Sequence, residues 1–203
     1  MKNTFRIILA SLFAFVLLAN TSAQARDKFL NIQEIQSEGG IQAWLVEDHS
    51  IPVIAFQFGF KGAGSIQDPA DKQGLARMLS NTMDEGAKDL DSEAFQKELR
   101  DNSISLSFSS SRDNFTGNLK TLSINKDKAF SLLKAALNEP RFDEEPVNRM
   151  RAANQSRIRS SLADPDWMAA RIMNDLAFEG HPYALNSGGT LSSLENITPE
   201  DLK

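Results

Sequence analysis

The chain has 203 residues, with 22 basic and 27 acidic side chains and no cysteine. This acidic balance argues against nucleic acid as a partner, because such binding needs a basic patch that displaces phosphate counterions. Without cysteine neither a disulfide framework nor a thiolate metal site can form, so stability has to come from a hydrophobic core.

The first 25 residues have the pattern of a cleavable signal peptide. Lys2 and Arg6 precede an apolar run over residues 7–19, and Ala23-Gln24-Ala25 supplies an A-x-A cleavage site. The apolar run is shorter than the roughly 20 residues that a membrane-spanning helix needs. We therefore expect export to the periplasm, cleavage after Ala25 and no membrane attachment afterwards. Residues 26–203 are long enough for one domain with a sizeable core.

Strands are predicted at the start of this domain. Residues 29–36 and 41–47 flank Gly39-Gly40 and read as a hairpin. Residues 52–60 form a nearly continuous apolar run, which is typical of a strand that is buried on both faces.

Two helices are predicted next. Residues 73–84 place Leu75, Met78, Leu79 and Met83 on one helical stripe, and this stripe is typical of core packing. A second helix opens at Asp91-Ser92 and extends to about Arg100.

A strand pair is predicted after these helices. Residues 103–109 alternate between serine and an apolar residue, which is the pattern of a half-buried strand. A turn at Ser111-Arg112-Asp113 then leads into a second strand over residues 115–124, so that the two strands pair in antiparallel fashion.

Helices dominate the remainder of the chain. Proline, aspartate and glycine residues mark the ends of predicted helices at residues 127–138, 144–162 and 165–179, and another helix is predicted to begin at Thr198-Pro199. The order of elements predicts an α+β fold, in which helices pack on one side of an antiparallel sheet.

Residues 59–86, GFKGAGSIQDPADKQGLARMLSNTMDEG, resemble the opening of the insulinase/pitrilysin family of zinc peptidases, to which mitochondrial processing peptidase belongs. In that family a His-x-x-Glu-His motif follows a Gly-Leu pair on a helix. Gly74-Leu75 are present here, and the motif then falls on Arg77, Ser80 and Asn81. Both imidazoles and the catalytic carboxylate are therefore missing.

These substitutions remove the chemistry that a hydrolytic zinc site requires. Positions i, i+3 and i+4 share one helical face, and zinc takes imidazole, thiolate or carboxylate ligands there. An arginine stays protonated and repels the metal. The resemblance places the third ligand, a glutamate, near Arg157, yet residues 147–163 contain no acidic side chain. We therefore expect no catalytic residue, no metal ligand and no cofactor in this chain.

The resemblance also implies how such a chain works. Inactive family members pair with active zinc-bearing siblings, and unfolded peptides add to a sheet edge that here aligns with Leu106, Ser107, Phe108 and Ser109. Family members usually carry a second homologous domain, so we expect residues 26–203 to be an N-terminal domain that is incomplete at its C-terminal end.

These implications lead to one main hypothesis and two alternatives. The main hypothesis is an exported, catalytically inactive homologue that binds peptides and assembles with an active peptidase. The first alternative is a stand-alone peptide-binding or assembly module. The second is an active zinc metalloendopeptidase with a relocated site, which would have to use His49 or His181, the only histidines of the chain.

Overall fold

The computed structural model describes residues 30–203, which divide into two compact units on either side of the boundary between Ile51 and Pro52. The predicted signal peptide at residues 1–25 lies outside the described residues. Among residues 30–203 there is no helix with the length and apolar character needed to cross a bilayer.

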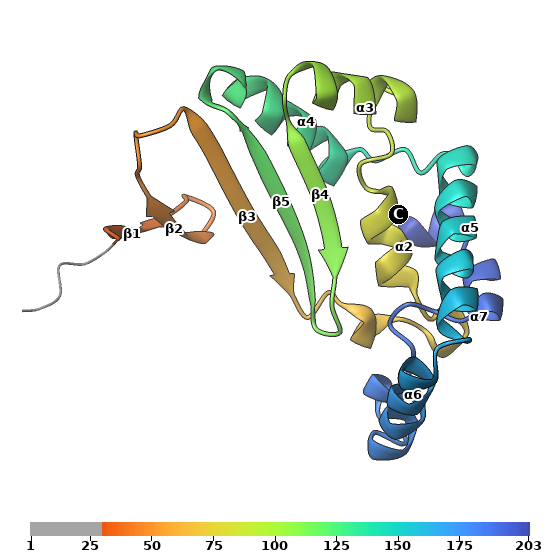
Figure 1. Cartoon of the computed structure of the whole chain (residues 1–203). Helices are drawn as coiled ribbons and strands as arrows, with labels where there is room; N and C mark the ends of the chain where they lie inside the picture. Colours follow the sequence, from red (N-terminus) through yellow and green to blue (C-terminus); the bar gives the residue numbers. More distant parts are fainter. Residues whose placement is uncertain (1–29) are drawn as a thin grey trace, which may run out of the picture. The chain divides into compact units, whose positions relative to one another are not determined.

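The first unit is the predicted hairpin. Strand β1 (Ile32–Gln36) pairs with strand β2 (Gln42–Val46) in antiparallel register (Figure 1). The turn between them uses Gly40, whose φ of 85° lies in the left-handed region that favours glycine. The side chain of Trp44 on β2 is 79% exposed.

The second unit contains a three-stranded antiparallel sheet in the order β3-β5-β4 (Figure 1). Its strands are β3 (Val53–Lys61), β4 (Ser105–Ser110) and β5 (Asn114–Leu122). In the central strand Leu119 lies opposite Phe56 on β3 and opposite Leu106 on β4. This register puts aromatic and aliphatic side chains of all three strands on one face and polar side chains on the other.

The helices of this unit are α2 (Leu75–Thr82), α3 (Ser92–Asp101), α4 (Lys126–Asn138), α5 (Glu144–Ser161), α6 (Pro165–Ala177) and α7 (Leu191–Glu195). Short 3-10 helices complete it: η1 (Ser65–Gln67), η2 (Ala70–Lys72), η3 (Ser123–Asn125), η4 (Pro182–Ala184) and η5 (Pro199–Leu202). The helices predicted from the sequence are present, except that residues after Thr198 form a 3-10 turn. Helix α7 was not predicted.

The core lies between the apolar face of the sheet and the helices. Its fully buried side chains include Met78 from α2, Phe95 from α3, Leu119 from β5 and Val147 from α5. The predicted strict alternation along β4 is confirmed, because Leu106 and Phe108 are buried while Ser105, Ser107 and Ser109 are exposed. The α+β class, with helices on one side of an antiparallel sheet, is likewise confirmed.

The expectation that the strand at residues 52–60 is buried on both faces is wrong. Strand β3 is present, but it is an edge strand of its sheet and pairs only with β5 among the described residues. Phe60 is 49% exposed, and Ala55, Gln57 and Gly59 on the opposite face are open to solvent. One face of β3 contacts the helical layer, where Phe56 meets Phe130 of α4 at 5.7 Å between ring centroids. An apolar run does not reveal whether a second layer covers its other face, and within residues 52–203 none does.

Candidate functional site

Helix α2, which carries the degenerate motif, is fixed at its N-terminus by a buried carboxylate. The Asp68 side chain accepts hydrogen bonds from the backbone N–H groups of Gly74 (2.9 Å) and Ala76 (3.0 Å). Burial raises the pKa of Asp68, and these backbone hydrogen bonds oppose that rise. Gly74 takes a φ of 90°, and an added Cβ would lie 2.8 Å from Gly189 Cα. Glycine is therefore required where the loop before α7 meets this helix.

Two of the three motif positions form structural hydrogen bonds within the helical layer. Ser80 is only 2% exposed, and its hydroxyl donates to the Arg77 carbonyl oxygen at 2.9 Å. The Asn81 amide Nδ2 donates to Asn154 Oδ1 on α5 at 3.1 Å. Asn154 is itself buried and also accepts a hydrogen bond from Arg157 Nη2 at 2.8 Å. Asn154 therefore connects α2, α5 and the guanidinium of Arg157.

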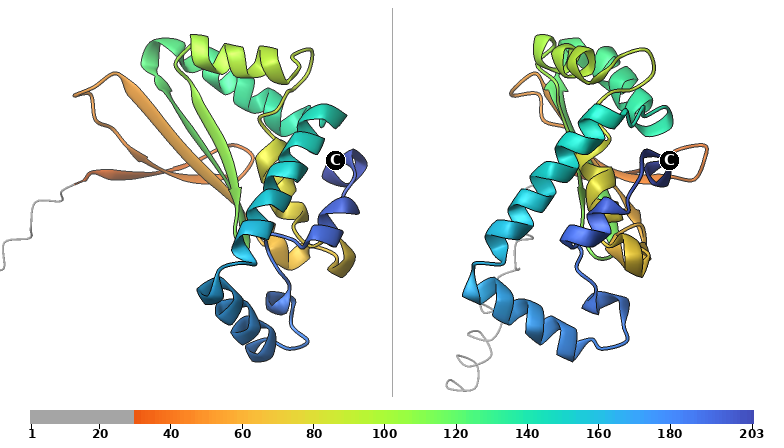
Figure 2. Two further views of the ribbon diagram at one scale, coloured as in Figure 1. Left: turned by 45° about the vertical axis from the view of Figure 1, so that its right-hand side comes forward. Right: turned by 90° about the vertical axis from the view of Figure 1, so that its right-hand side faces the viewer.

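The third motif residue, Arg77, lines a cavity of about 260 Å³ together with Arg157. Arg77 Nε is buried and has no hydrogen-bond partner among the described residues. Burial lowers the pKa of Arg77, and the neighbouring positive charge of Arg157 lowers it further. Two guanidinium groups therefore share one cavity between α2 and α5, which lie side by side in both views of Figure 2.

The rest of the cavity wall comes from the end of α5, from α6 and from the loop before α7. Ser161 and Trp167 line it from the helices, and residues 186–188 line it from the loop. The loop is held against the start of α2 by the Asn186 N–H, which donates to Gln73 Oε1 at 2.8 Å. Among residues 30–203 no acidic side chain lines this cavity.

These residues do not fit the zinc ion that a His-x-x-Glu-His peptidase holds. The structure places Arg157, where the third ligand was expected, on the same cavity as Arg77. A zinc ion there would face two fixed cations and no imidazole or carboxylate donor.

Each of the two histidines of the chain contacts a residue close to it in the sequence. His181 Nδ1 accepts from the Tyr183 N–H (3.1 Å) at the start of η4. The side chain of His49 is 88% exposed beside Glu47. Within residues 30–203 the structure contains no group of three or more histidine, aspartate or glutamate side chains with the arrangement of a metal site.

The predicted peptide-binding residues lie on β4, at the other edge of the sheet from β3. Ser111 and Asn114 flank the turn between β4 and β5. The Ser111 N–H donates to the Asn114 carbonyl oxygen at 2.8 Å, so these two residues form a hydrogen-bonded pair of the antiparallel ladder. Such pairs alternate along a ladder. Ser105, Ser107 and Ser109 therefore direct their backbone groups at β5, and Leu106 and Phe108 direct theirs away from the sheet. The four predicted residues therefore differ in backbone direction. Leu106 and Phe108 have backbone groups that are free to bind a peptide, whereas those of Ser107 and Ser109 are bonded to β5.

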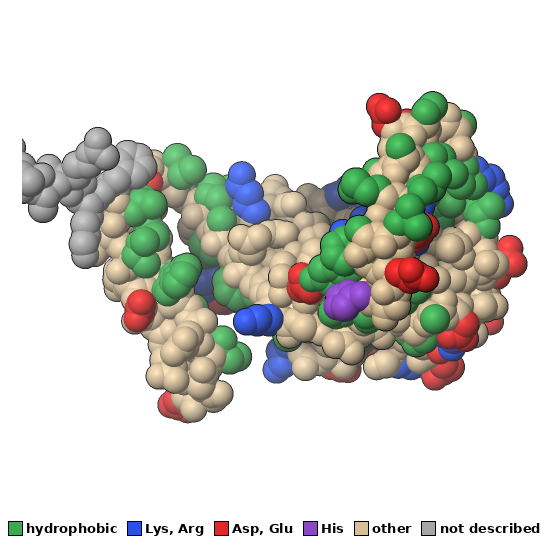
Figure 3. Space-filling model, turned by 90° about the horizontal axis from the view of Figure 1, so that it is seen from below, with side chains coloured by type: hydrophobic (Ala, Val, Ile, Leu, Met, Phe, Trp, Pro, Cys, Tyr) green, Lys and Arg blue, Asp and Glu red, His purple; other side chains and the backbone are tan. Residues whose placement is uncertain are grey.

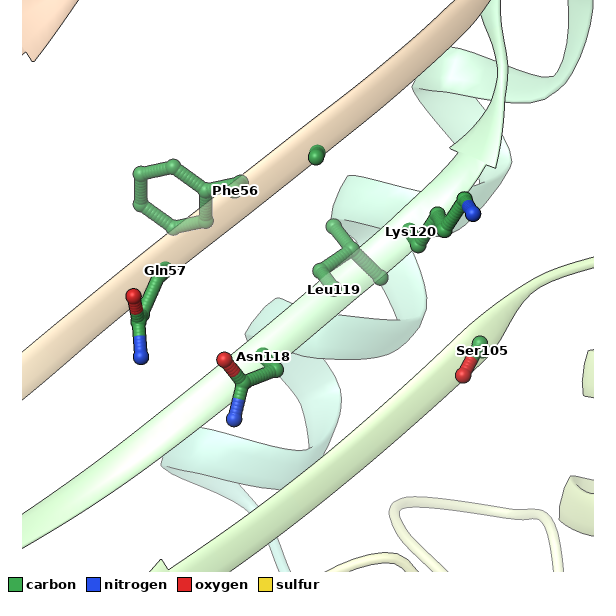
Figure 4. Close-up of a pocket in the computed structure, with 7 residues that line it drawn as sticks. Phe56, Gln57, Ser105, Asn118, Leu119 and Lys120 are labelled. Atoms are coloured by element: carbon green, nitrogen blue, oxygen red, sulfur yellow. The ribbon is translucent and has the colours of Figure 1, made fainter.

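A depression of about 460 Å³ lies over the middle of the three strands (Figure 4). Gln57, Asn118, Lys120 and Ser105 line it from β3, β5 and β4. These side chains are polar and exposed, and they were not selected as candidate site residues from the sequence. The sequence alternation along β5 could have identified two of them, because the polar residues Asn118 and Lys120 flank the apolar Leu119, which is buried.

The fold is that of a peptidase-type domain, and the positions that the resemblance aligns with the zinc motif carry Arg77, Ser80 and Asn81. The profile of the family Insulinase (Peptidase family M16) matches residues 60–190. The chain therefore belongs to the insulinase family, peptidase family M16.

Two sequence relatives show which members of this family the chain is similar to. It is 26% identical over 191 residues to the non-peptidase homologue YmxG of Helicobacter pylori, covering 94% of this chain and 44% of that protein. It is 25% identical over 141 residues to a probable mitochondrial-processing peptidase subunit beta of Arabidopsis thaliana, covering 70% of this chain and 27% of that protein. The chain spans less than half the length of these relatives.

Solved structures show the same fold. The inactive peptidase M16 domain from Pseudomonas fluorescens superposes with a TM-score of 0.78 at 22% identity, covering 85% of this chain and 42% of that one. Pitrilysin superposes with a TM-score of 0.65 at 23% identity, covering 84% of this chain and 18% of that one. The insulinase-like architecture is thus kept in a chain whose motif positions are Arg77, Ser80 and Asn81.

Proposed function

We propose that this chain is a non-catalytic subunit that binds extended peptides and assembles with an active zinc peptidase of the same family. The observation that carries the proposal is the replacement of every metal-binding position on a retained insulinase-type scaffold. Arg77 and Arg157 occupy positions where the resemblance implies ligands, and Ser80 and Asn81 are hydrogen-bonded within the helical layer. Such a chain keeps surfaces for binding while hydrolysis has to come from a partner.

The proposed peptide site is the outer edge of β4. The backbone N–H and C=O groups of Leu106 and Phe108 point away from β5, and within residues 30–203 no strand pairs with this edge. An extended peptide can add there as a further antiparallel or parallel strand, with main-chain hydrogen bonds supplying affinity. The exposed serines give the adjoining surface few charges, so the site would accept many sequences.

Backbone methylation of the ligand tests this site without changing the protein. A fluorescein-labelled ten-residue peptide rich in valine and threonine is compared with a version that is N-methylated at alternate residues and with a version that is N-methylated at every residue. An added strand directs only every second N–H at its neighbour, so alternate methylation leaves one edge intact. We expect the alternately methylated peptide to bind, measured by fluorescence anisotropy, and the fully methylated peptide not to bind. Equal binding of the fully methylated peptide would rule out strand addition.

Partner assembly is tested separately by co-purification. The full chain carrying an affinity tag is expressed in its own host and recovered from the periplasm. The proposal predicts that a family member with an intact His-x-x-Glu-His motif is recovered in a stoichiometric ratio. Recovery of the periplasmic chain without such a partner would instead favour the stand-alone peptide-binding module. Recovery from another compartment would contradict the proposed export.

A relocated active site makes an opposite prediction. It requires stoichiometric metal and peptide cleavage that a chelator abolishes. Metal analysis of the purified full chain, together with a peptide-cleavage assay with and without a chelator, distinguishes this alternative. Within residues 30–203 no three histidine, aspartate or glutamate side chains are grouped as a metal site, so we expect neither.

A further inference from the structure

The cavity between α2, α5 and α6 carries a positive charge that no described residue balances. Arg77 and Arg157 both line it, and within residues 30–203 neither forms an ion pair with an acidic side chain. The chain as a whole is acidic, with a formal net charge of -5. Arg149 on the same helix differs from Arg157, since it contacts Glu85 at 2.6 Å and Glu145 at 2.7 Å. Figure 3 shows basic and acidic side chains close together along the lower right of one face of the molecule.

One hydrogen-bond donor of a side chain that lines this cavity lacks an acceptor. Arg77 Nε is buried and has no partner within residues 30–203, although buried polar groups nearly always find one. Asn154 holds the Arg157 guanidinium through its Oδ1 and so fixes its orientation. A negatively charged oxygen in the cavity would accept from Arg77 and reduce the repulsion between the two cations.

The remaining wall also suits an oxyanion. Ser161 and Ser187 contribute hydroxyl groups, Asn186 contributes an amide, and Trp167 can donate from its indole nitrogen. Within the described part of the chain no acidic side chain belongs to this lining, so the usual competitor for the guanidinium groups is missing there. A volume of about 260 Å³ accommodates a group the size of an acidic side chain.

We propose that this cavity binds a carboxylate group, presented either by an acidic residue of a peptide or by a small free carboxylate. The planar guanidinium fork matches a carboxylate in shape and charge. The positions that hold a cation in the zinc peptidases would thus hold an anion here. This inference does not depend on strand addition at β4, because a small carboxylate can reach the cavity without an extended peptide.

Tryptophan fluorescence gives a direct readout at the site. The chain has two tryptophans, and Trp44 is exposed on the hairpin, so Trp44→Phe leaves Trp167 in the cavity wall as the only reporter. The full chain with this change is titrated with four probes: an acetylated and amidated pentapeptide with a central glutamate, its glutamine twin, acetate, and inorganic phosphate. We expect a saturable signal with the glutamate peptide and none with the glutamine twin.

The probes distinguish the source of the carboxylate. A response to acetate as strong as that to the glutamate peptide assigns the site to free carboxylates, and a much weaker response assigns it to peptides. Equal binding of the two peptides, a preference for phosphate, or no response to either carboxylate would overturn the proposal.

Arginine variants provide the matched control. Arg77→Gln and Arg157→Gln should each weaken carboxylate binding at least tenfold, because each removes a charge-assisted donor. Arg159→Gln removes an exposed charge from the same helix outside the cavity lining and should leave binding unchanged. Circular dichroism checks that each variant is folded. If Arg77→Gln fails to fold, the exposed Arg157 still decides the question, and unchanged binding by Arg157→Gln would refute the proposal.

Discussion

The clearest prediction concerns Asp84, a carboxylate just beyond the C-terminus of α2. Burial raises its pKa to about 6 from an ordinary value of 3.8, and the adjacent Glu85 charge contributes to the rise. The Gln96 amide donates to Asp84 Oδ2 at 3.4 Å, and this hydrogen bond opposes the rise in the pKa only in part. The same amide donates to the Asp84 backbone carbonyl oxygen at 3.0 Å. The charged form of Asp84 is therefore disfavoured in the folded protein.

The sign and size of the effect follow from proton linkage. Because the pKa is higher in the folded state, the folded chain holds more protons than the unfolded chain between about pH 4 and pH 6. Protonation of Asp84 therefore contributes favourably to the free energy of unfolding. This contribution is complete below the unfolded pKa of 3.8 and is lost as the pH rises through about 6. A shift of this size corresponds to at most about 3 kcal/mol. Residual solvent access reduces it, so we expect about 1–3 kcal/mol.

Asp84→Asn removes the ionisable group while it keeps the shape and a hydrogen-bond acceptor for Gln96. The free energy of unfolding of the variant should equal that of the parent near pH 4 and should be higher by about 1–3 kcal/mol above pH 7. Urea unfolding followed by circular dichroism at a series of pH values measures this difference. Asp127→Asn, at a side chain that is 98% exposed, serves as the control and should show no such pH dependence. A difference that stays constant with pH would refute the reasoning.

Three further predictions test the packing and the altered motif. Gly117→Ala should destabilise the chain by about 1–3 kcal/mol in urea unfolding, because the new Cβ would lie 2.2 Å from the Phe58 ring; an unchanged midpoint would contradict the packing of β3 against β5. Asp91→Ala should cost about 1 kcal/mol, because Asp91 accepts from the Ala94 N–H at 2.9 Å as the N-cap of α3, and an equal loss in Asp91→Asn would show that capping is not the cause. The third prediction compares the double variant Arg77→His with Asn81→His and the triple variant that also carries Arg157→Glu. The triple variant should bind zinc at least tenfold more tightly, measured by competition with a chromogenic chelator, because a third ligand joins the two imidazoles. Equal zinc affinity of the two variants would show that residue 157 does not belong to the site.

The parts of the fold that depend on local periodicity could be predicted from the sequence. The alternation of serine with Leu106 and Phe108 predicted β4, and Asp91 predicted the start of α3. The burial of β3 could not be predicted, because it depends on which strands lie beside it. An apolar run such as residues 52–60 looks the same at the edge of a sheet as at its centre.

The candidate site was predictable only in part, for a related reason. The motif spacing identified Arg77, Ser80 and Asn81 because they lie within one helical turn. The hydrogen bond between Asn81 and Asn154 spans 73 residues of sequence and has no local signal. The same holds for Asp68, which caps α2 across an intervening 3-10 helix.

The altered motif and the cavity charge together favour a change of role over a simple loss of one. Loss of metal binding alone would be satisfied by any small or apolar side chains at residues 77 and 157, and at residue 77, which is partly buried, an apolar group would avoid the cost of burying a cation. Instead two arginines converge on one cavity, and the buried Asn154 orients one of them. Maintaining this arrangement carries a free-energy cost in the isolated chain. A bound anion offsets that cost, so carboxylate should raise the thermal stability of the parent chain and should have little effect on Arg77→Gln.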